Sequence, residues 1–196
     1  MNKKFQHINK KAYLRETLTS NPFELFSVLS TAIKTFQYRY LFRCIGIETI
    51  VGKGTQVFNF SNVKIGSHCL IQDHVYIRAG LKGKVKIGDY CAINSFAKLF
   101  GHGGIEIGDY SQIGPGTLIT TTVHDYKGSL EADFQAVHIG KWVWIGACAT
   151  VLAGITIGDK SVIGAGSIVI KDIPPNCVAV GNPAQVIKKK DGQNAD

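Results

Sequence analysis

The segment from Ile139 to Val169 reads IGKWVWIGACATVLAGITIGDKSVIGAGSIV and carries an aliphatic side chain at every sixth position. The same spacing occurs earlier, in the triplets Ile65–Ile71–Ile77, Ile87–Ile93–Leu99 and Ile107–Ile113–Ile119. A period of six matches neither an amphipathic helix nor an alternating strand. It is typical of a parallel β-helix, in which three six-residue units close one triangular coil. We therefore predict an all-β solenoid of about five or six coils from Val51 to Val169.

Each place in the six-residue unit has a physical role in such a fold. The aliphatic side chain points inward, so stability grows as neighbouring coils stack. Glycine often follows it, as at Gly88 and Gly108, and we expect it to let the chain turn a corner without a Cβ clash. The fifth place is small, and we expect Cys69 and Cys91 to fill it as compact apolar groups. A sandwich of alternating strands would instead give a period of two.

The chain divides into a helical segment at 1–46, the β-helix at 47–185 and a basic, polar tail at 186–196. A polar excursion at 124–138 leaves the solenoid as a protruding loop, and loops of this length in a regular scaffold are often functional.

Within the N-terminal segment, Asn21 and Pro22 fit a helix start as N-cap and first helical residue. The predicted helix gathers Phe26, Leu29, Ile33, Phe36, Tyr40 and Leu41 on one face. We expect this face to pack on the first coils and cap them, because a bare end exposes core and strand edges. Peripheral contact of residues 23–43 with lipid headgroups is the alternative.

Charge and cysteine content limit the function classes. Residues 1–46 contain eight Lys or Arg against two acids, out of a net charge of +8, which suits an acidic ligand or an anionic membrane. No nucleic-acid-binding motif is present. No apolar run is long enough to span a membrane. Five cysteines, none in a Cys-x-x-Cys pair, indicate reduced thiols in a cytoplasmic protein rather than disulfides or a structural zinc site.

Two residues around the excursion point to chemistry. His124 opens the excursion directly after a predicted strand, and an imidazole accepts protons near neutral pH. Trp144 lies just beyond its return, beside Gly140 and Gly146, where an outer wall could hold an extended ligand.

The C-terminal motifs resemble those of a known family. The segments Trp144-Ile145-Gly146-Ala147, Gly154-Ile155-Thr156-Ile157-Gly158-Asp159, Val162-Ile163-Gly164-Ala165-Gly166-Ser167, Lys171-Asp172-Ile173-Pro174-Pro175 and Gly181-Asn182-Pro183-Ala184 are similar to the hexapeptide-repeat acyltransferases, in particular the galactoside and maltose O-acetyltransferase branch. The resemblance covers roughly residues 60–190. It implies a left-handed β-helix, an acetyl-CoA co-substrate without a metal, and a homotrimer with active sites between neighbouring prisms.

The resemblance also implies residue roles. His124 matches the catalytic base, while Asn94, His102 and Trp144 match acceptor-side positions. His102 stands where the galactoside enzymes have an aspartate, which changes the expected acceptor. The expected CoA contacts are Gly146, Ala147, Ala165, Ile170, Lys171 and Lys188.

In the expected mechanism, neutral His124 removes a proton from a sugar hydroxyl as its oxygen attacks the thioester carbonyl. A backbone N–H around Gly146–Ala147 would stabilise the oxyanion. Asp125, Glu131 and Asp133 are the acids that could orient the imidazole, and the sequence does not choose among them.

The implied function is acetyl-CoA-dependent O-acetylation of a sugar hydroxyl of a cell-surface polysaccharide or its precursor, in the cytoplasm at the inner face of the membrane. An N-acetyltransferase of a nucleotide-linked amino sugar is one alternative. A γ-class carbonic anhydrase-like metalloenzyme is another, although no histidine pair has the five-residue spacing that such a site uses.

Overall fold

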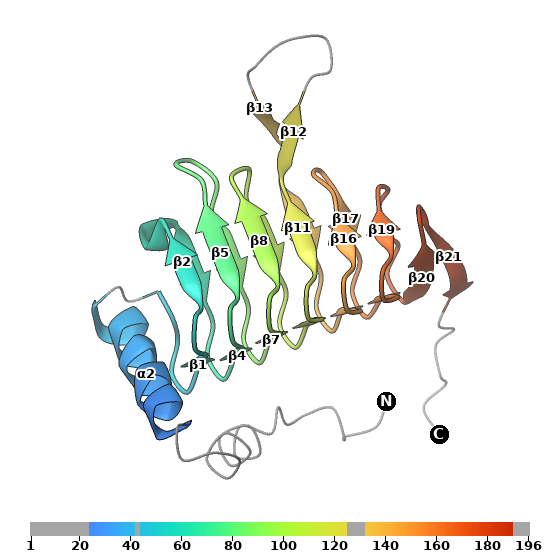
Figure 1. The fold of residues 1–196 in the computed structure, drawn as a ribbon. Coiled ribbons are helices and arrows are strands. Elements are labelled where there is room, and N and C mark those ends of the chain that lie inside the picture. The colour runs from blue at the N-terminus through green and yellow to red at the C-terminus, as the bar shows by residue number, and fades with distance from the viewer. Residues whose placement is uncertain (1–23, 42–43, 125–131, 190–196) are drawn as a thin grey trace.

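Three short strands per coil wind into a triangular prism in the computed structural model (Figure 1). The structure describes residues 24–41, 44–124 and 132–189. It is a left-handed parallel β-helix of about six coils, which confirms the predicted fold class. The expected helix start at Asn21 and Pro22 lies outside the described residues.

The three sides of the prism are sheets that we call A, B and C. Sheet A contains β3 (Val63–Ile65), β6 (Val85–Ile87), β9 (Ile105–Ile107), β14 (Val137–Ile139) and β17 (Thr156–Ile157). Sheet B contains β1 (Ile50–Val51), β4 (Leu70–Ile71), β7 (Ala92–Ile93), β10 (Gln112–Ile113), β15 (Trp144–Ile145), β18 (Val162–Ile163), β20 (Cys177–Gly181) and β21 (Ala184–Lys189). Sheet C contains β2 (Gln56–Phe58), β5 (Tyr76–Ala79), β8 (Lys98–Gly101), β11 (Leu118–Thr120), β16 (Thr150–Val151) and β19 (Ile168–Val169).

The predicted aliphatic positions form the interior of the prism. In sheet B, Ile93, Ile113, Ile145 and Ile163 pair in register on successive coils and are at most 1% exposed. Stacking removes these side chains from water only when a neighbouring coil is present, so the coils stabilise one another.

The corner between sheets A and B corrects the expected role of glycine. The chain turns at Tyr90, Tyr110 and Trp142, whose φ angles are 58°, 61° and 59°. A Cβ atom at Gly108 would lie 2.7 Å from the carbonyl carbon of Gly140 in the next coil. Glycine here allows close stacking of coils, whereas the left-handed turn is made two residues later.

The fifth place of the unit is buried, and its serine and cysteine side chains form hydrogen bonds between coils. Ser111 Oγ donates a hydrogen bond to the Gly140 carbonyl (2.8 Å) and accepts one from the Val143 N–H (3.1 Å). In the same way, the Cys69 thiol donates to the Gly88 carbonyl (3.1 Å). The side chains of Ser111 and Cys69 thus link successive coils by hydrogen bonds. Cys69 and Cys91 are fully buried in the hydrophobic core, as predicted, and the thiol hydrogen bonds add to that role.

The N-terminal helix α2 (Glu24–Phe36) continues as a π-helical turn, η2 (Gln37–Leu41), and contacts β1 at the open end of the prism. The apolar face was expected to pack there. Instead Leu29, Ile33, Phe36 and Tyr40 are exposed, while Thr31 and Tyr38 are buried. The predicted orientation of the helix was therefore wrong for these four side chains, and those of Phe26 and Leu41 lie outside the description.

The excursion differs from the predicted open loop. Strands β12 (Thr122–His124) and β13 (Ala132–Phe134) pair as an antiparallel hairpin that projects from the prism (Figure 1). Residues 125–131 lie outside the described part. Strand β21 includes residues 186–189 of the predicted tail, because it pairs with β20. The 3-10 turn η3 (Phe60–Asn62) follows β2.

Candidate active site

His124 is the last residue of β12 and its side chain is exposed. The chain leaves sheet C at the end of β11 and enters the hairpin before it joins sheet A at β14. The hairpin therefore carries His124 outward from the corner between sheets C and A, away from the body of the prism (Figure 1).

The hairpin register decides one question that the sequence left open. His124 pairs with Ala132, and Val123 pairs with Asp133. Because paired residues of an antiparallel ladder share a face and adjacent residues alternate, Asp133 projects from the face opposite His124. Its carboxylate accepts a hydrogen bond from the Phe134 N–H at 2.8 Å. Asp133 is thus unsuited to orient the imidazole, and Asp125 and Glu131 lie outside the described residues.

His102 lies beneath the hairpin at the same corner. Its ring stacks on Phe134, with ring centroids 5.7 Å apart. Its Nδ1 atom is buried and has no hydrogen-bond partner among the described residues. A buried, unpaired N–H is costlier than an unpaired lone pair, so we assign the hydrogen to Nε2, where it can be donated to an acceptor oxygen.

Asn94 lies across sheet C from His102, at the corner between sheets B and C. Its Nδ2 donates a 2.7 Å hydrogen bond to the Ile113 carbonyl. This bond fixes the amide and leaves Oδ1 as a hydrogen-bond acceptor for a hydroxyl donor. Asn94 and His102 thus lie at the two ends of β8.

An arginine that the sequence analysis missed stands between these two residues. Arg78, Phe100 and Thr120 are in register on the outer face of sheet C. The Arg78 guanidinium lies 4.4 Å from the centroid of the Phe58 ring and donates a 2.6 Å hydrogen bond to the Tyr76 hydroxyl. The aromatic contacts hold a half-buried cation on this wall. The sequence does contain a pattern that could have indicated this wall. An aromatic or basic residue recurs at equivalent positions of successive coils, at Phe58, Arg78 and Phe100.

Trp144 is 53% exposed on the outer face of sheet B. The neighbouring B–C corner carries small residues in the C-terminal coils, at Ala147 and Ala165, whereas His74 and Phe96 stack there in the N-terminal coils. A corner without large side chains leaves room for a narrow, extended ligand such as a pantetheine arm.

The backbone here narrows the choice of oxyanion donor within the predicted pair, Gly146 and Ala147. The Gly146 N–H donates to the Ile163 carbonyl at 2.8 Å and is occupied by the coil ladder. A Cβ at Gly146 would lie 2.5 Å from the Ala165 nitrogen, so this glycine serves the packing of coils. The Ala147 N–H has no partner within the described residues and is the donor that remains.

The remaining predicted CoA contacts lie at the C-terminal end. Ile170 and Lys171 follow β19 at the C–A corner, and Ile170 is 43% exposed. Lys188 is exposed on β21, opposite Val178 of β20. The two lysines thus place positive charge on the last coils.

The candidate residues fall on two corners of the prism. Asn94, Ala147 and Ala165 lie at the B–C corner, while His102 and His124 lie at the C–A corner. A side of six residues spans up to about 20 Å at roughly 3.3 Å per residue. Proton transfer requires heavy atoms about 3 Å apart. One chain alone therefore separates the base from the expected thioester site.

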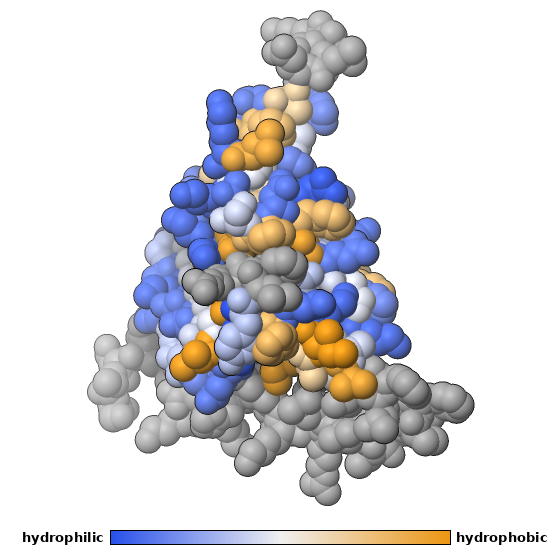
Figure 2. Space-filling model, turned by 90° about the vertical axis from the view of Figure 1, so that its left-hand side faces the viewer, coloured by the Kyte–Doolittle hydropathy of each residue, from blue (hydrophilic) through white to orange (hydrophobic). Residues whose placement is uncertain are grey.

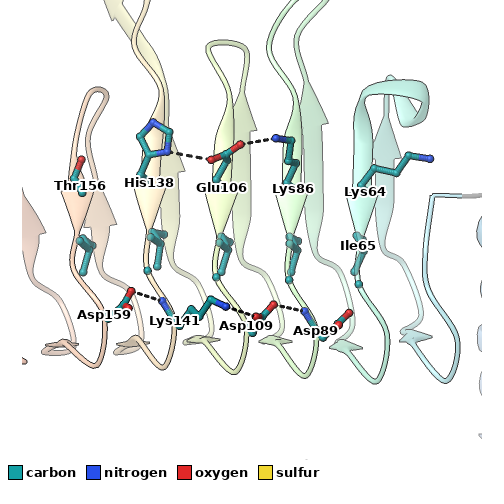
Figure 3. A pocket seen from close by; sticks show the side chains of 18 of the residues that line it. Lys64, Ile65, Lys86, Asp89, Glu106, Asp109, His138, Lys141, Thr156 and Asp159 are labelled. Atoms are coloured by element: carbon teal, nitrogen blue, oxygen red, sulfur yellow. Dashed lines mark hydrogen bonds and ion pairs between the residues drawn. The ribbon is translucent and has the colours of Figure 1, made fainter. Parts of the chain in front are cut away.

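A shallow hollow lies elsewhere, on the outer face of sheet A. Its volume is about 770 Å³ and it contains none of the predicted site residues. Figure 3 shows its charges paired along the wall: Lys86 with Glu106 at 2.7 Å, and Glu106 with His138 at 3.4 Å. The hydrogen bond from Lys86 lowers the pKa of Glu106. These charged side chains form ion pairs with one another across successive coils, as is common on a surface that faces solvent.

The other histidines of the described residues do not gather at one place. His68 stacks on Tyr90 at the A–B corner and His74 on Phe96 at the B–C corner, whereas His138 lies on sheet A. Among the residues that the structure describes, no three His, Cys, Asp or Glu side chains form a group that could hold a metal ion.

Comparison with known proteins finds a matching repeat family and similar acetyltransferases. Residues 136–171 match a family described as the hexapeptide repeat of succinyl-transferase. The chain is 36% identical over 129 residues to the galactoside O-acetyltransferase of Escherichia coli (strain K12), covering 64% of this chain and 63% of that protein. It is 39% identical over 130 residues to the Lactococcus lactis galactoside O-acetyltransferase, covering 64% and 62%. The aligned part thus spans less than two thirds of these relatives.

Among solved structures, a mutant of AntD superimposes with a TM-score of 0.74 at 25% identity, over 83% of this chain and 91% of that one. AntD is an N-acyltransferase from Bacillus cereus, in complex with dTDP-4-amino-4,6-dideoxyglucose and coenzyme A. The fold, the repeat and these matches make the chain similar to the hexapeptide-repeat acyltransferases. Among curated proteins, the similarity extends to the galactoside O-acetyltransferases.

Proposed function

We propose that the protein transfers an acetyl group from acetyl-CoA to a sugar hydroxyl of a cell-surface polysaccharide or its precursor. The observation that carries the proposal is the presentation of His124 on a hairpin whose same face bears Phe134, which in turn stacks on His102. This places a base beside a hydrogen-bond donor and an aromatic surface. The relationship to the galactoside O-acetyltransferases supports acetyl transfer.

The chain supplies a group for each step of such a transfer. His124 accepts the hydroxyl proton as the sugar oxygen forms a bond to the thioester carbonyl carbon. The Ala147 N–H donates to the oxyanion. When the carbon–sulfur bond breaks, the imidazolium returns the proton to the CoA thiolate. The products are an acetyl ester and CoA, with no covalent enzyme intermediate.

We propose that the site forms between copies of the chain in a homotrimer. The B–C corner of one prism would supply Ala147 and Ala165, and the C–A corner of its neighbour would supply His102 and His124. Closed cyclic assembly repeats this cleft three times. The separation of the two corners within one chain supports the arrangement.

The acceptor would lie on the outer face of sheet C beside His102, with Arg78 on the neighbouring strand, and only an acceptor of several sugar units would also reach Asn94 at the other end of this side. An arginine held by aromatic rings binds carboxylate or phosphate well, so we propose an acceptor that carries negative charge. A cytoplasmic location agrees with the free thiols of the described chain.

N-acylation of a nucleotide-linked amino sugar is the second candidate, because AntD has this fold and is an N-acyltransferase in complex with a dTDP-linked amino sugar. The two reactions leave different products, since an acetyl ester is cleaved by mild base and an amide is not.

The test combines acetyl-CoA with neutral sugars, uronic acids, amino sugars and nucleotide sugars, and detects released thiol. We expect acceptor-dependent release of CoA and a base-labile product. A base-stable product would favour N-acylation. Failure of the protein to bind acetyl-CoA in calorimetry would contradict both candidates.

A further inference from the structure

The polar side of helix α2 covers the open end of the prism. Thr35 Oγ1 accepts a hydrogen bond from the Val51 N–H at 3.0 Å. Lys34 and Arg39 each donate a 2.8 Å hydrogen bond to a backbone carbonyl of the first coil, at Thr55 and Thr49. These bonds satisfy backbone groups at an edge where no further coil follows. They also fix the rotation of the helix about its axis.

The opposite side of the helix is apolar and faces outward. We call Leu29, Ile33, Phe36 and Tyr40 the α2 apolar face. Their spacing of four, three and four residues places them on one stripe. They are 57%, 49%, 56% and 60% exposed, and the rings of Phe36 and Tyr40 lie 4.8 Å apart. Figure 2 views the molecule from the end that carries α2 and shows hydrophobic side chains at that surface.

Helix α2 is oriented in the opposite way to a helix whose only role is to cover a hydrophobic core. Such a helix buries its apolar stripe and turns its polar side to water. Here the capping hydrogen bonds hold the apolar stripe away from the prism, and four large exposed apolar side chains on one stripe form a patch of the kind that marks an interaction surface.

The charge of the sequence that precedes helix α2 favours an anionic partner for the α2 apolar face. Residues 1–23, which precede the helix, contain Lys3, Lys4, Lys10, Lys11 and Arg15 against the single acid Glu16. Basic side chains close to an anionic bilayer are attracted to its surface. Among the described residues, no helix is long and apolar enough to cross a membrane. An apolar stripe flanked by basic residues suits insertion at the headgroup level.

We propose that the α2 apolar face docks the protein on an anionic lipid surface, with α2 parallel to the membrane plane. The four side chains enter the boundary between headgroups and acyl chains. This inference is independent of the acetyl-transfer proposal, because it uses none of the candidate catalytic residues.

Co-sedimentation of the full chain with lipid vesicles tests the proposal. We expect binding to vesicles of phosphatidylglycerol and phosphatidylcholine, with binding weakened by 0.5 M salt and by removal of the anionic lipid. The variant L29Q/I33Q/F36Q should bind at least about tenfold more weakly, since it replaces three of the four apolar side chains that would be buried on binding. The control L81Q, which changes a leucine that is 92% exposed and distant from α2, should bind like the wild type.

Three results would overturn the proposal. One is the absence of wild-type binding to anionic vesicles, and another is equal binding by the triple variant when thermal melting shows that it is folded. The third is a smaller oligomer for the triple variant in sedimentation velocity without lipid, which would assign the face to a second copy. A chain lacking residues 1–22 should still bind the vesicles, but more weakly than the full chain. If this truncated chain did not bind at all while the triple variant bound like the wild type, the contact would be assigned to the basic segment.

Discussion

The ring of His102 lies 5.7 Å from the ring of Phe134 at an interplanar angle of 25°. This contact joins a corner of the prism to the hairpin that bears His124. Because Thr122 pairs with Phe134 and His124 with Ala132, the stacked ring and the imidazole of His124 share one face of the hairpin. Two histidines with different roles therefore border the same space.

His124→Ala should lower kcat by roughly 10²–10⁴-fold and leave acetyl-CoA affinity nearly unchanged, as expected for loss of a general base. His102→Ala should mainly raise the KM for the acceptor, since this side chain is expected to bind sugar in the ground and transition states alike. Steady-state kinetics and calorimetry with CoA measure both effects. Equal loss of kcat in the two variants, with unchanged acceptor KM, would show that the roles are assigned wrongly.

Asp133→Asn should change kcat by less than about threefold, because the carboxylate projects from the face opposite His124 and bonds to the adjacent backbone. A matched kinetic comparison with Asp125→Asn and Glu131→Gln measures the remaining candidates. If Asp133→Asn alone abolished activity, the hairpin register would have to differ in the active enzyme.

Arg78→Gln should lower kcat/KM for acidic acceptors by at least about tenfold and leave neutral sugars within about threefold, because it removes a positive charge and its bidentate fork. The ratio for glucuronate against glucose, measured in the wild type and the variant, reports this directly. An unchanged ratio, or the same loss for both sugars, would place the acceptor away from Arg78.

Tyr110→Ala should destabilise the fold by about 1–3 kcal/mol, because its ring stacks between Tyr90 at 4.9 Å and Trp142 at 4.2 Å. Tyr110→Phe keeps the stack and should lie within about 1 kcal/mol of the wild type. Denaturant unfolding at equal protein concentration measures both. Equal stability of the Ala and Phe variants would show that the stacked corner contributes little.

The prism was predictable from sequence because one repeated physical rule governs it. Every sixth side chain must be apolar to enter the interior, and Ile93, Ile113 and Ile145 are fully buried as that rule requires. The role of Gly108 was less predictable, since a close approach between coils depends on residues 32 positions apart. The rotation of α2 depended on backbone groups of the first coil that amphipathic patterning does not represent.

The candidate site was predictable only in part. The motifs identified His124, Asn94 and His102, and the structure adds that they lie on two corners joined by sheet C. Arg78 was missed because its significance comes from register with Phe100 and contact with Phe58, which are distant in sequence. The occupied N–H of Gly146 could be recognised only once the coil ladder was known.

The central claim is that each active site takes one corner from each of two neighbouring chains. Co-expression of His124→Ala with Ala165→Trp tests it most directly, since the first variant lacks the base and the second blocks the B–C corner. Each variant alone should be nearly inactive. In a mixed trimer, a site works when an Ala165→Trp chain supplies its base and a His124→Ala chain supplies its B–C corner. If the two chains mix randomly in equal amounts, about one quarter of the sites meet both conditions, so about one quarter of wild-type activity should be restored. Mixed trimers no more active than either variant alone would contradict a site shared between chains.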